Sequence, residues 1–68
     1  MPNTVYKVVE IVGTSPDSIS KAIDNAIAKA SSSLRHLGWF EVIETRGTIE
    51  NGKVGQYQVS LKVGFTLE

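Results

Sequence analysis

The sequence predicts an α+β fold in which a three-stranded antiparallel sheet wraps around one amphipathic helix, in the order strand, helix, strand, strand. Three observations lead to this prediction: a β-branched segment at residues 5–12, a helical pattern of apolar residues over 15–38, and two extended segments joined by Asn51-Gly52. The chain has 68 residues, and we expect one domain over residues 1–68.

The first segment, residues 5–12, is followed by Gly13, and its many β-branched side chains predict a strand that leads into the helix. Alternate side chains of a strand lie on opposite faces. One face carries Tyr6, Val8, Glu10 and Val12, and the other carries Val5, Lys7, Val9 and Ile11. Because both faces are largely apolar, two interpretations stay open: this is the central strand of the sheet, or its second face contacts another subunit.

The most regular pattern in the chain predicts a single helix from Ser15 to Gly38. Its apolar stripe consists of Ile19, Ala22, Ile23, Ala26, Ile27, Ala30, Leu34 and Leu37. At the start, we expect Ser15 to be the N-cap and Pro16 to take the first helical position. At the end, we expect Arg35 and His36 in the last turn, and Gly38 in the left-handed conformation that terminates a helix.

Asn51-Gly52 predicts a hairpin, because both residues accept the positive φ of a type I′ turn. Counting outward from this turn pairs Glu50 with Lys53, Ile49 with Val54, Thr45 with Gln58, Glu41 with Lys62 and Trp39 with Gly64. Gly47 is a candidate bulge position, and a bulge there would shift these assignments beyond it.

The same count assigns side chains to the two faces of the sheet. In the last strand, the side chains expected to cover the helix are Tyr57, Val59, Leu61, Val63, Phe65 and Leu67. Phe40 and Val42 join them from the neighbouring strand. The side chains expected to point away from the helix are Trp39, Glu41, Ile43 and Thr45.

Composition restricts the classes of function. Seven basic and seven acidic residues give a formal net charge of zero, so the charge predicts no binding to nucleic acid or to an anionic membrane. The absence of a recognisable signal peptide or long apolar run favours a cytoplasmic location. A domain of this size buries only about 60% of the surface that its unfolded chain exposes, so we expect identical subunits to associate.

We find no arrangement typical of an enzyme. The single histidine, His36, is expected in the last helical turn, where a capping role is more common than catalysis. Glu41 and Glu44 are expected on opposite sides of a strand, where they would not converge. One histidine and no cysteine predict no metal site.

Trp39, the only tryptophan, is expected on the sheet face away from the core, where its large apolar ring favours contact with a planar ligand or with another subunit. Gln58 is expected on the same face, with an amide that can donate and accept hydrogen bonds. Thr45, the predicted partner of Gln58, lies six positions from Trp39, or about 20 Å of strand. A site shared by Trp39 and Gln58 would therefore need two subunits.

Five segments together resemble the dodecin family, which consists of small flavin-binding proteins. They are residues 12–15 (VGTS), 38–42 (GWFEV), 46–48 (RGT), 57–59 (YQV) and 63–65 (VGF). The resemblance implies a hollow homododecamer that holds pairs of flavins between tryptophans of related subunits, for storage, sequestration and photoprotection and not for turnover. The alternative is a structural oligomerisation domain without a ligand.

The resemblance also implies roles for three residues. Trp39 matches the residue that stacks on the flavin, and Gln58 matches the one that hydrogen-bonds the polar edge of the isoalloxazine. Arg46 matches an arginine that resembles a contact to the flavin or its phosphate-bearing chain. Thr66 replaces an arginine that bacterial relatives often have, which leaves FMN, riboflavin and FAD open as the preferred flavin. Some members also bind coenzyme A, for which no residue here is a candidate.

Overall fold

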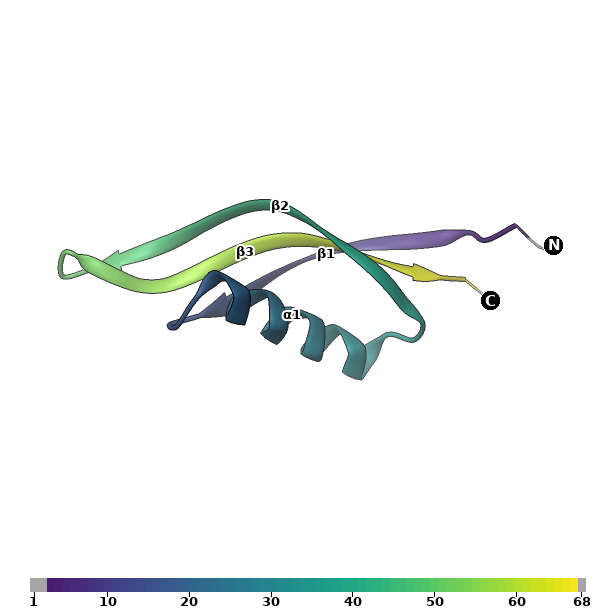
Figure 1. Ribbon diagram of the computed structural model, residues 1–68, viewed down its shortest axis with the longest axis horizontal. Helices are drawn as coiled ribbons and strands as arrows, with labels where there is room; N and C mark the ends of the chain where they lie inside the picture. The colour runs from purple at the N-terminus through teal and green to yellow at the C-terminus, as the bar shows by residue number, and fades with distance from the viewer. Residues whose placement is uncertain (1–2, 68) are drawn as a thin grey trace.

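The computed structural model describes residues 3–67, which form three strands and one helix in the predicted order (Figure 1). The elements are β1 (Tyr6–Ser15), α1 (Ile19–Ser33), β2 (Leu37–Glu50) and β3 (Lys53–Thr66). The strands form one antiparallel sheet in the order β1-β3-β2, and α1 runs along one face of it. The predicted fold class is confirmed.

The central strand of the sheet is β3, and β1 lies at an edge. Of the two interpretations of the first segment, the central position is therefore wrong. Both β1 and β2 pair with β3, because the hairpin places β2 on one side of it and leaves only the other side for β1. β1 is therefore an edge strand whose two faces are both largely apolar.

The helix is shorter than predicted at its N-terminus. Its N-cap is Ser18, whose hydroxyl oxygen accepts a hydrogen bond from the backbone N–H of Lys21 at 3.0 Å. Ser15 is instead the last residue of β1, where it pairs with Tyr57 of β3. Ser15 does not cap the helix, because the helix begins only at Ile19; its hydroxyl accepts from the N–H of Asp17 at 3.0 Å.

The helix also ends before the predicted position, at Ser33 with Leu34 as C-cap. In the last turn, the hydroxyl of Ser32 donates to the carbonyl of Lys29 at 2.7 Å, a local bond that makes serine a poor residue for helix interiors. His36, and not Gly38, takes the left-handed conformation, with φ of 62°. Arg35 and His36 therefore follow the helix, and Leu37 already begins β2.

The core lies between α1 and the sheet. The buried residues of α1 are Ala22, Ala26 and Ala30, and those of β3 on this side are Val59, Leu61 and Val63. Small helix residues allow the strands to approach closely. A Cβ atom added to Gly13 of β1 would overlap the carbonyl oxygen of Ala22 and lie 2.7 Å from Cβ of Ala26. Only glycine fits at this crossing of strand and helix.

The hairpin turn forms as predicted, with Asn51 at φ 55° and Gly52 at φ 74°. The predicted pairs Glu50–Lys53, Ile49–Val54, Glu41–Lys62 and Trp39–Gly64 are confirmed. The pair Thr45–Gln58 is wrong, because Gln58 pairs with Arg46. A register shift between Gly47 and Ile49, next to the candidate bulge, causes this difference, and a second shift between Val42 and Glu44 reverses it.

These shifts change which residues of β2 point away from α1. Thr45 pairs with Val59, a core residue, so its predicted outward position is wrong. Glu41 and Glu44 pair with Lys62 and Ser60, two residues of β3 that share a face, so their predicted positions on opposite sides are also wrong. We call the sheet face away from α1 the outer face, and define it by Tyr6, Val8, Glu10, Val12 and Thr14 of β1, Trp39, Glu41, Glu44 and Arg46 of β2, and Gln58, Ser60, Lys62, Gly64 and Thr66 of β3.

Candidate ligand-binding site

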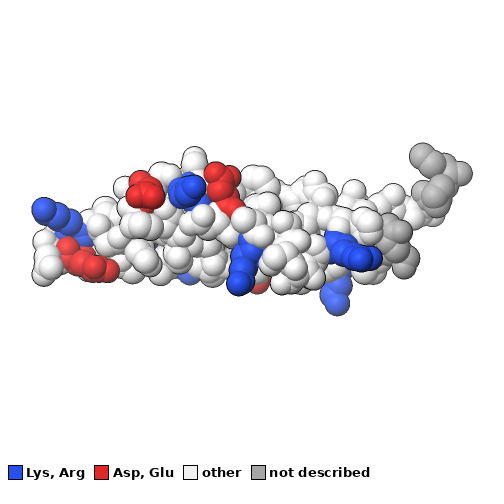
Figure 2. Space-filling view, turned by 90° about the horizontal axis from the view of Figure 1, so that it is seen from below, with Lys and Arg blue, Asp and Glu red and all other residues white. Residues whose placement is uncertain are grey.

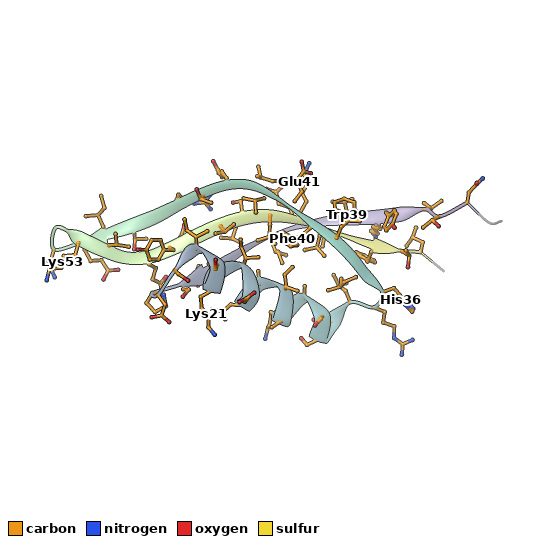
Figure 3. All side chains as sticks on the ribbon, in the orientation of Figure 1. Lys21, His36, Trp39, Phe40, Glu41 and Lys53 are labelled. Carbon is orange, nitrogen blue, oxygen red and sulfur yellow. The ribbon has the colours of Figure 1, made fainter. Side chains whose placement is uncertain are left out.

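Trp39 lies flat against the sheet on the outer face, at the position of Gly64 in the neighbouring strand. A Cβ atom added to Gly64 would overlap Cε2 and Cζ2 of the indole and lie 2.8 Å from its Cδ2. The six-membered ring of the indole therefore occupies the space that the missing side chain of residue 64 leaves. Figure 3 shows Trp39 and Glu41 on the side of the sheet away from α1, and Phe40 on the side toward it.

A second aromatic ring borders the indole. The ring centroids of Tyr6 and Trp39 are 5.8 Å apart, with the planes inclined at 60°, an edge-to-face arrangement. Trp39 nevertheless remains 40% exposed in the single chain. The sheet and Tyr6 thus hold one side of the indole, and an apolar surface of the ring is open to a ligand or to another subunit.

Arg46 and Gln58 form a polar group on the outer face with two further residues. The Nε–H of Arg46 donates to Oε1 of Gln58 at 2.9 Å. Nη1 of the same guanidinium donates to Oε1 of Glu44 at 2.8 Å and to Oγ of Ser60 at 3.0 Å. We call Glu44, Arg46, Gln58 and Ser60 the arginine cluster.

The structure brings together two of the three predicted site residues. Arg46 and Gln58 are hydrogen-bonded, whereas Trp39 lies opposite Gly64, six positions along β3 from Gln58. Six residues of strand span about 20 Å. In one chain, therefore, the indole and the arginine cluster cannot contact the same small ring system, and the need for two subunits stays a prediction.

Three residues around the site were not expected from the sequence. The sequence analysis assigns Tyr6 to one face of its strand but predicts no contact between it and Trp39. The signal that could have predicted this contact is Gly64, because it lies on β3, between the strands of Tyr6 and Trp39, and has no side chain to separate the two rings. Glu44 and Ser60 join Arg46 only because of the register shift after Val42. The sequence shows the glycine, but it does not show the shift.

Large apolar side chains remain exposed on both sides of the site. On β1 of the outer face they are Tyr6, Val8 and Val12, and at the hairpin they include Ile49, which is 82% exposed. On the α1 side of the molecule, charged side chains are few and lie scattered among uncharged ones (Figure 2). A single chain thus leaves apolar surface that association with other copies would remove from water.

The part of the chain that the structure describes contains neither a metal-binding cluster nor a helix that could span a membrane. Residues 3–67 contain no group of three or more histidine, cysteine, aspartate or glutamate side chains that could hold a metal ion. Within the same residues, no helix is both long and apolar enough to cross a membrane.

Comparison with known proteins identifies the family. The family model described as dodecin matches residues 5–68. The chain belongs to the dodecin family. A curated dodecin from Thermus thermophilus is 58% identical over 64 residues, which cover 94% of this chain and 93% of that protein. The solved structure of a dodecin from Streptomyces coelicolor has a TM-score of 0.96 and 54% identity, and the match covers 100% of this chain and 97% of that one.

A more distant member carries a different name. A protein from Mycobacterium tuberculosis named calcium dodecin is 33% identical over 64 residues, which cover 94% of this chain and 90% of that protein. Family membership makes this chain a small binding protein and not an enzyme, as predicted. It also supports assembly of identical subunits and the binding of a small ligand.

Proposed function

We propose that the protein binds flavin at subunit interfaces of a homododecamer, and that it stores, sequesters and photoprotects this cofactor. The observation that carries the proposal is the position of Trp39, whose indole is held against Gly64 and Tyr6 and is still 40% exposed. A planar ring stacked on the open side of the indole would gain about 0.5–1.5 kcal/mol beyond the area that it buries.

In this proposal, the arginine cluster binds the polar edge of the isoalloxazine. Gln58 supplies an amide that can donate and accept hydrogen bonds, and Arg46 lies directly beside it. Because about 20 Å of strand separates Gln58 from Gly64, each flavin would contact residues of two subunits. Exposed Tyr6, Val8 and Val12 on the same face supply apolar surface for this interface.

Photoprotection would follow from the chemistry of the stacked pair. An indole is electron-rich, and Trp39 in contact with an excited isoalloxazine would transfer an electron to it. Rapid return of the electron would discharge the excitation before oxygen or another molecule meets the flavin. FMN, riboflavin and FAD are all candidates, and coenzyme A is a further candidate ligand for the assembly.

Fluorescence titration tests this function directly. Adding the purified protein to riboflavin, FMN or FAD should quench the flavin emission in a saturable way, and light scattering should give the mass of twelve subunits. Unchanged emission of all three flavins would overturn flavin binding and would support a structural oligomerisation domain. A stable monomer or dimer at micromolar concentration would overturn the dodecamer.

A further inference from the structure

The hydrogen bond between Arg46 and Gln58 fixes the orientation of the Gln58 amide. A guanidinium has donors and no acceptor, so only the oxygen of the amide can face it. Oε1 of Gln58 indeed lies 2.9 Å from Nε of Arg46. The amide nitrogen of Gln58, with its two N–H groups, is therefore directed away from Arg46.

Arg46 is itself held in place by two more acceptors. Nη1 donates to Glu44 Oε1 at 2.8 Å and to Ser60 Oγ at 3.0 Å. Ser60 is only 5% exposed and belongs to the central strand, so its hydroxyl is a fixed acceptor. Three acceptors from two strands thus hold one guanidinium, which leaves Arg46 little freedom to turn toward a ligand.

The charge of Arg46 is also offset within the cluster. The carboxylate of Glu44 forms an ion pair with it, and the two side chains are partly exposed, at 64% for Glu44 and 42% for Arg46. One positive and one negative group at this distance give the arginine cluster no formal net charge. The adjacent carboxylate therefore reduces the positive charge that Arg46 presents to a phosphate.

We propose that Arg46 is a positioning residue: it holds Oε1 of Gln58, so that Gln58 turns its N–H donors toward the ligand and the site selects a planar ligand whose edge carries hydrogen-bond acceptors. This inference rests on the proposed function, and it names the edge of the flavin that Gln58 reads: carbonyl oxygens or an unprotonated ring nitrogen. Arg46 acts on the ligand through Gln58 and not through the phosphate of FMN.

Titration with two flavins tests the inference, because riboflavin has no phosphate and FMN has one. We would compare the parent, Arg46→Met, Gln58→Met and the double variant. Arg46→Met should weaken the binding of both flavins by the same factor, about tenfold, as expected for one hydrogen bond. In the Gln58→Met background, the Arg46→Met change should cause no further loss.

Two results would overturn the inference. A loss confined to FMN would indicate that Arg46 contacts the phosphate, and additive losses in the double variant would indicate that it contacts the ring directly. Arg35→Met is the matched control, since it makes the same change at an exposed arginine after the helix. It should leave both affinities unchanged.

A measurement without ligand separates this inference from the proposed function. The chain contains two arginines, so selective ¹⁵N labelling of arginine gives two Nε–H signals by nuclear magnetic resonance. The signal of Arg46 should exchange with solvent more slowly than that of Arg35, and Gln58→Met should remove this protection. Equal exchange in the parent would overturn the inference.

Gln58→Glu completes the test. A carboxylate still accepts from Arg46 but offers no donor, so this variant should keep the slow exchange of the Arg46 Nε–H and bind flavin no better than Gln58→Met. Flavin binding at the parent level would overturn the selection of acceptor edges. If the parent quenches neither flavin, the proposed function fails, and the exchange rates separately decide whether Arg46 holds Gln58.

Discussion

Gly64→Ala should displace the indole of Trp39. The three atoms nearest to an added Cβ all belong to Trp39, and the backbone of Gly64 lies outside the positive-φ region that alanine avoids. Ordinary contact between carbon atoms requires about 3.5–4.0 Å, whereas Cδ2 of the indole would be at 2.8 Å and two further ring atoms would overlap. The indole must therefore move by about 1 Å or more.

The cost follows from this overlap. Overpacking by one methyl group costs about 1–3 kcal/mol, and replacing glycine within a strand returns about 0.5–1 kcal/mol. We therefore expect Gly64→Ala to lower the free energy of unfolding by about 1 kcal/mol, and by no more than about 2.5 kcal/mol, measured from guanidinium denaturation at one fixed protein concentration. Because Trp39 is the only tryptophan, its emission should shift to longer wavelength, and the affinity for FMN should fall.

A double-mutant cycle provides the control. In a Trp39→Ala background no ring opposes the added methyl group, so Gly64→Ala should stabilise the protein by about 0.5–1 kcal/mol. The effect on stability thus changes sign between the two backgrounds. If Gly64→Ala destabilises both backgrounds equally, or leaves the emission of Trp39 and its quenching of flavin unchanged, the indole does not lie on Gly64 as described.

Three further predictions concern the site and the assembly. Trp39→Phe should retain much of the flavin binding but lose much of the quenching, which time-resolved flavin fluorescence would show; complete quenching would contradict electron transfer from the indole. Gln58→Ala should weaken flavin binding by roughly 1–3 kcal/mol in calorimetric titration, because a buried polar edge loses its partner; an unchanged affinity would place Gln58 outside the site. Trp39→Ala should still assemble to the parent mass in light scattering if the indole serves mainly the ligand, and dissociation would make it an interface residue instead.

The hairpin shows how far the sequence alone can lead. Asn51 and Gly52 have the positive φ that their types favour, and the pairs at both ends of the hairpin follow by counting. The same count predicts Trp39 opposite Gly64, and it is correct there because the two register shifts between the turn and Trp39 cancel. Local turn chemistry fixes a register at its origin, and the alternation of side chains carries it along the strand.

The ends of the helix show where local signals compete. Ser15 and Ser18 are both suitable N-caps by type, and the sequence favoured Ser15 because Pro16 follows it. Pairing with Tyr57 keeps Ser15 in β1, and the helix begins only at Ile19, so Ser18 and not Ser15 occupies the cap position. This contact joins residues far apart in the chain, and no local propensity reports it.

The position of Arg46 depends on two register shifts that cancel. Between Ile49 and Gly47 the strand β3 contains one residue more than β2, and at Ile43 the strand β2 contains one more than β3. Only the residues between these points change face, so Glu41 and Trp39 keep the register counted from the turn. An unshifted count would pair Arg46 with Tyr57, on the α1 side, whereas the observed register pairs it with Gln58 on the outer face. Two small irregularities in the strands thus move Arg46 onto the face of the tryptophan and create the arginine cluster, while Trp39 and Glu41 keep the partners counted from the turn.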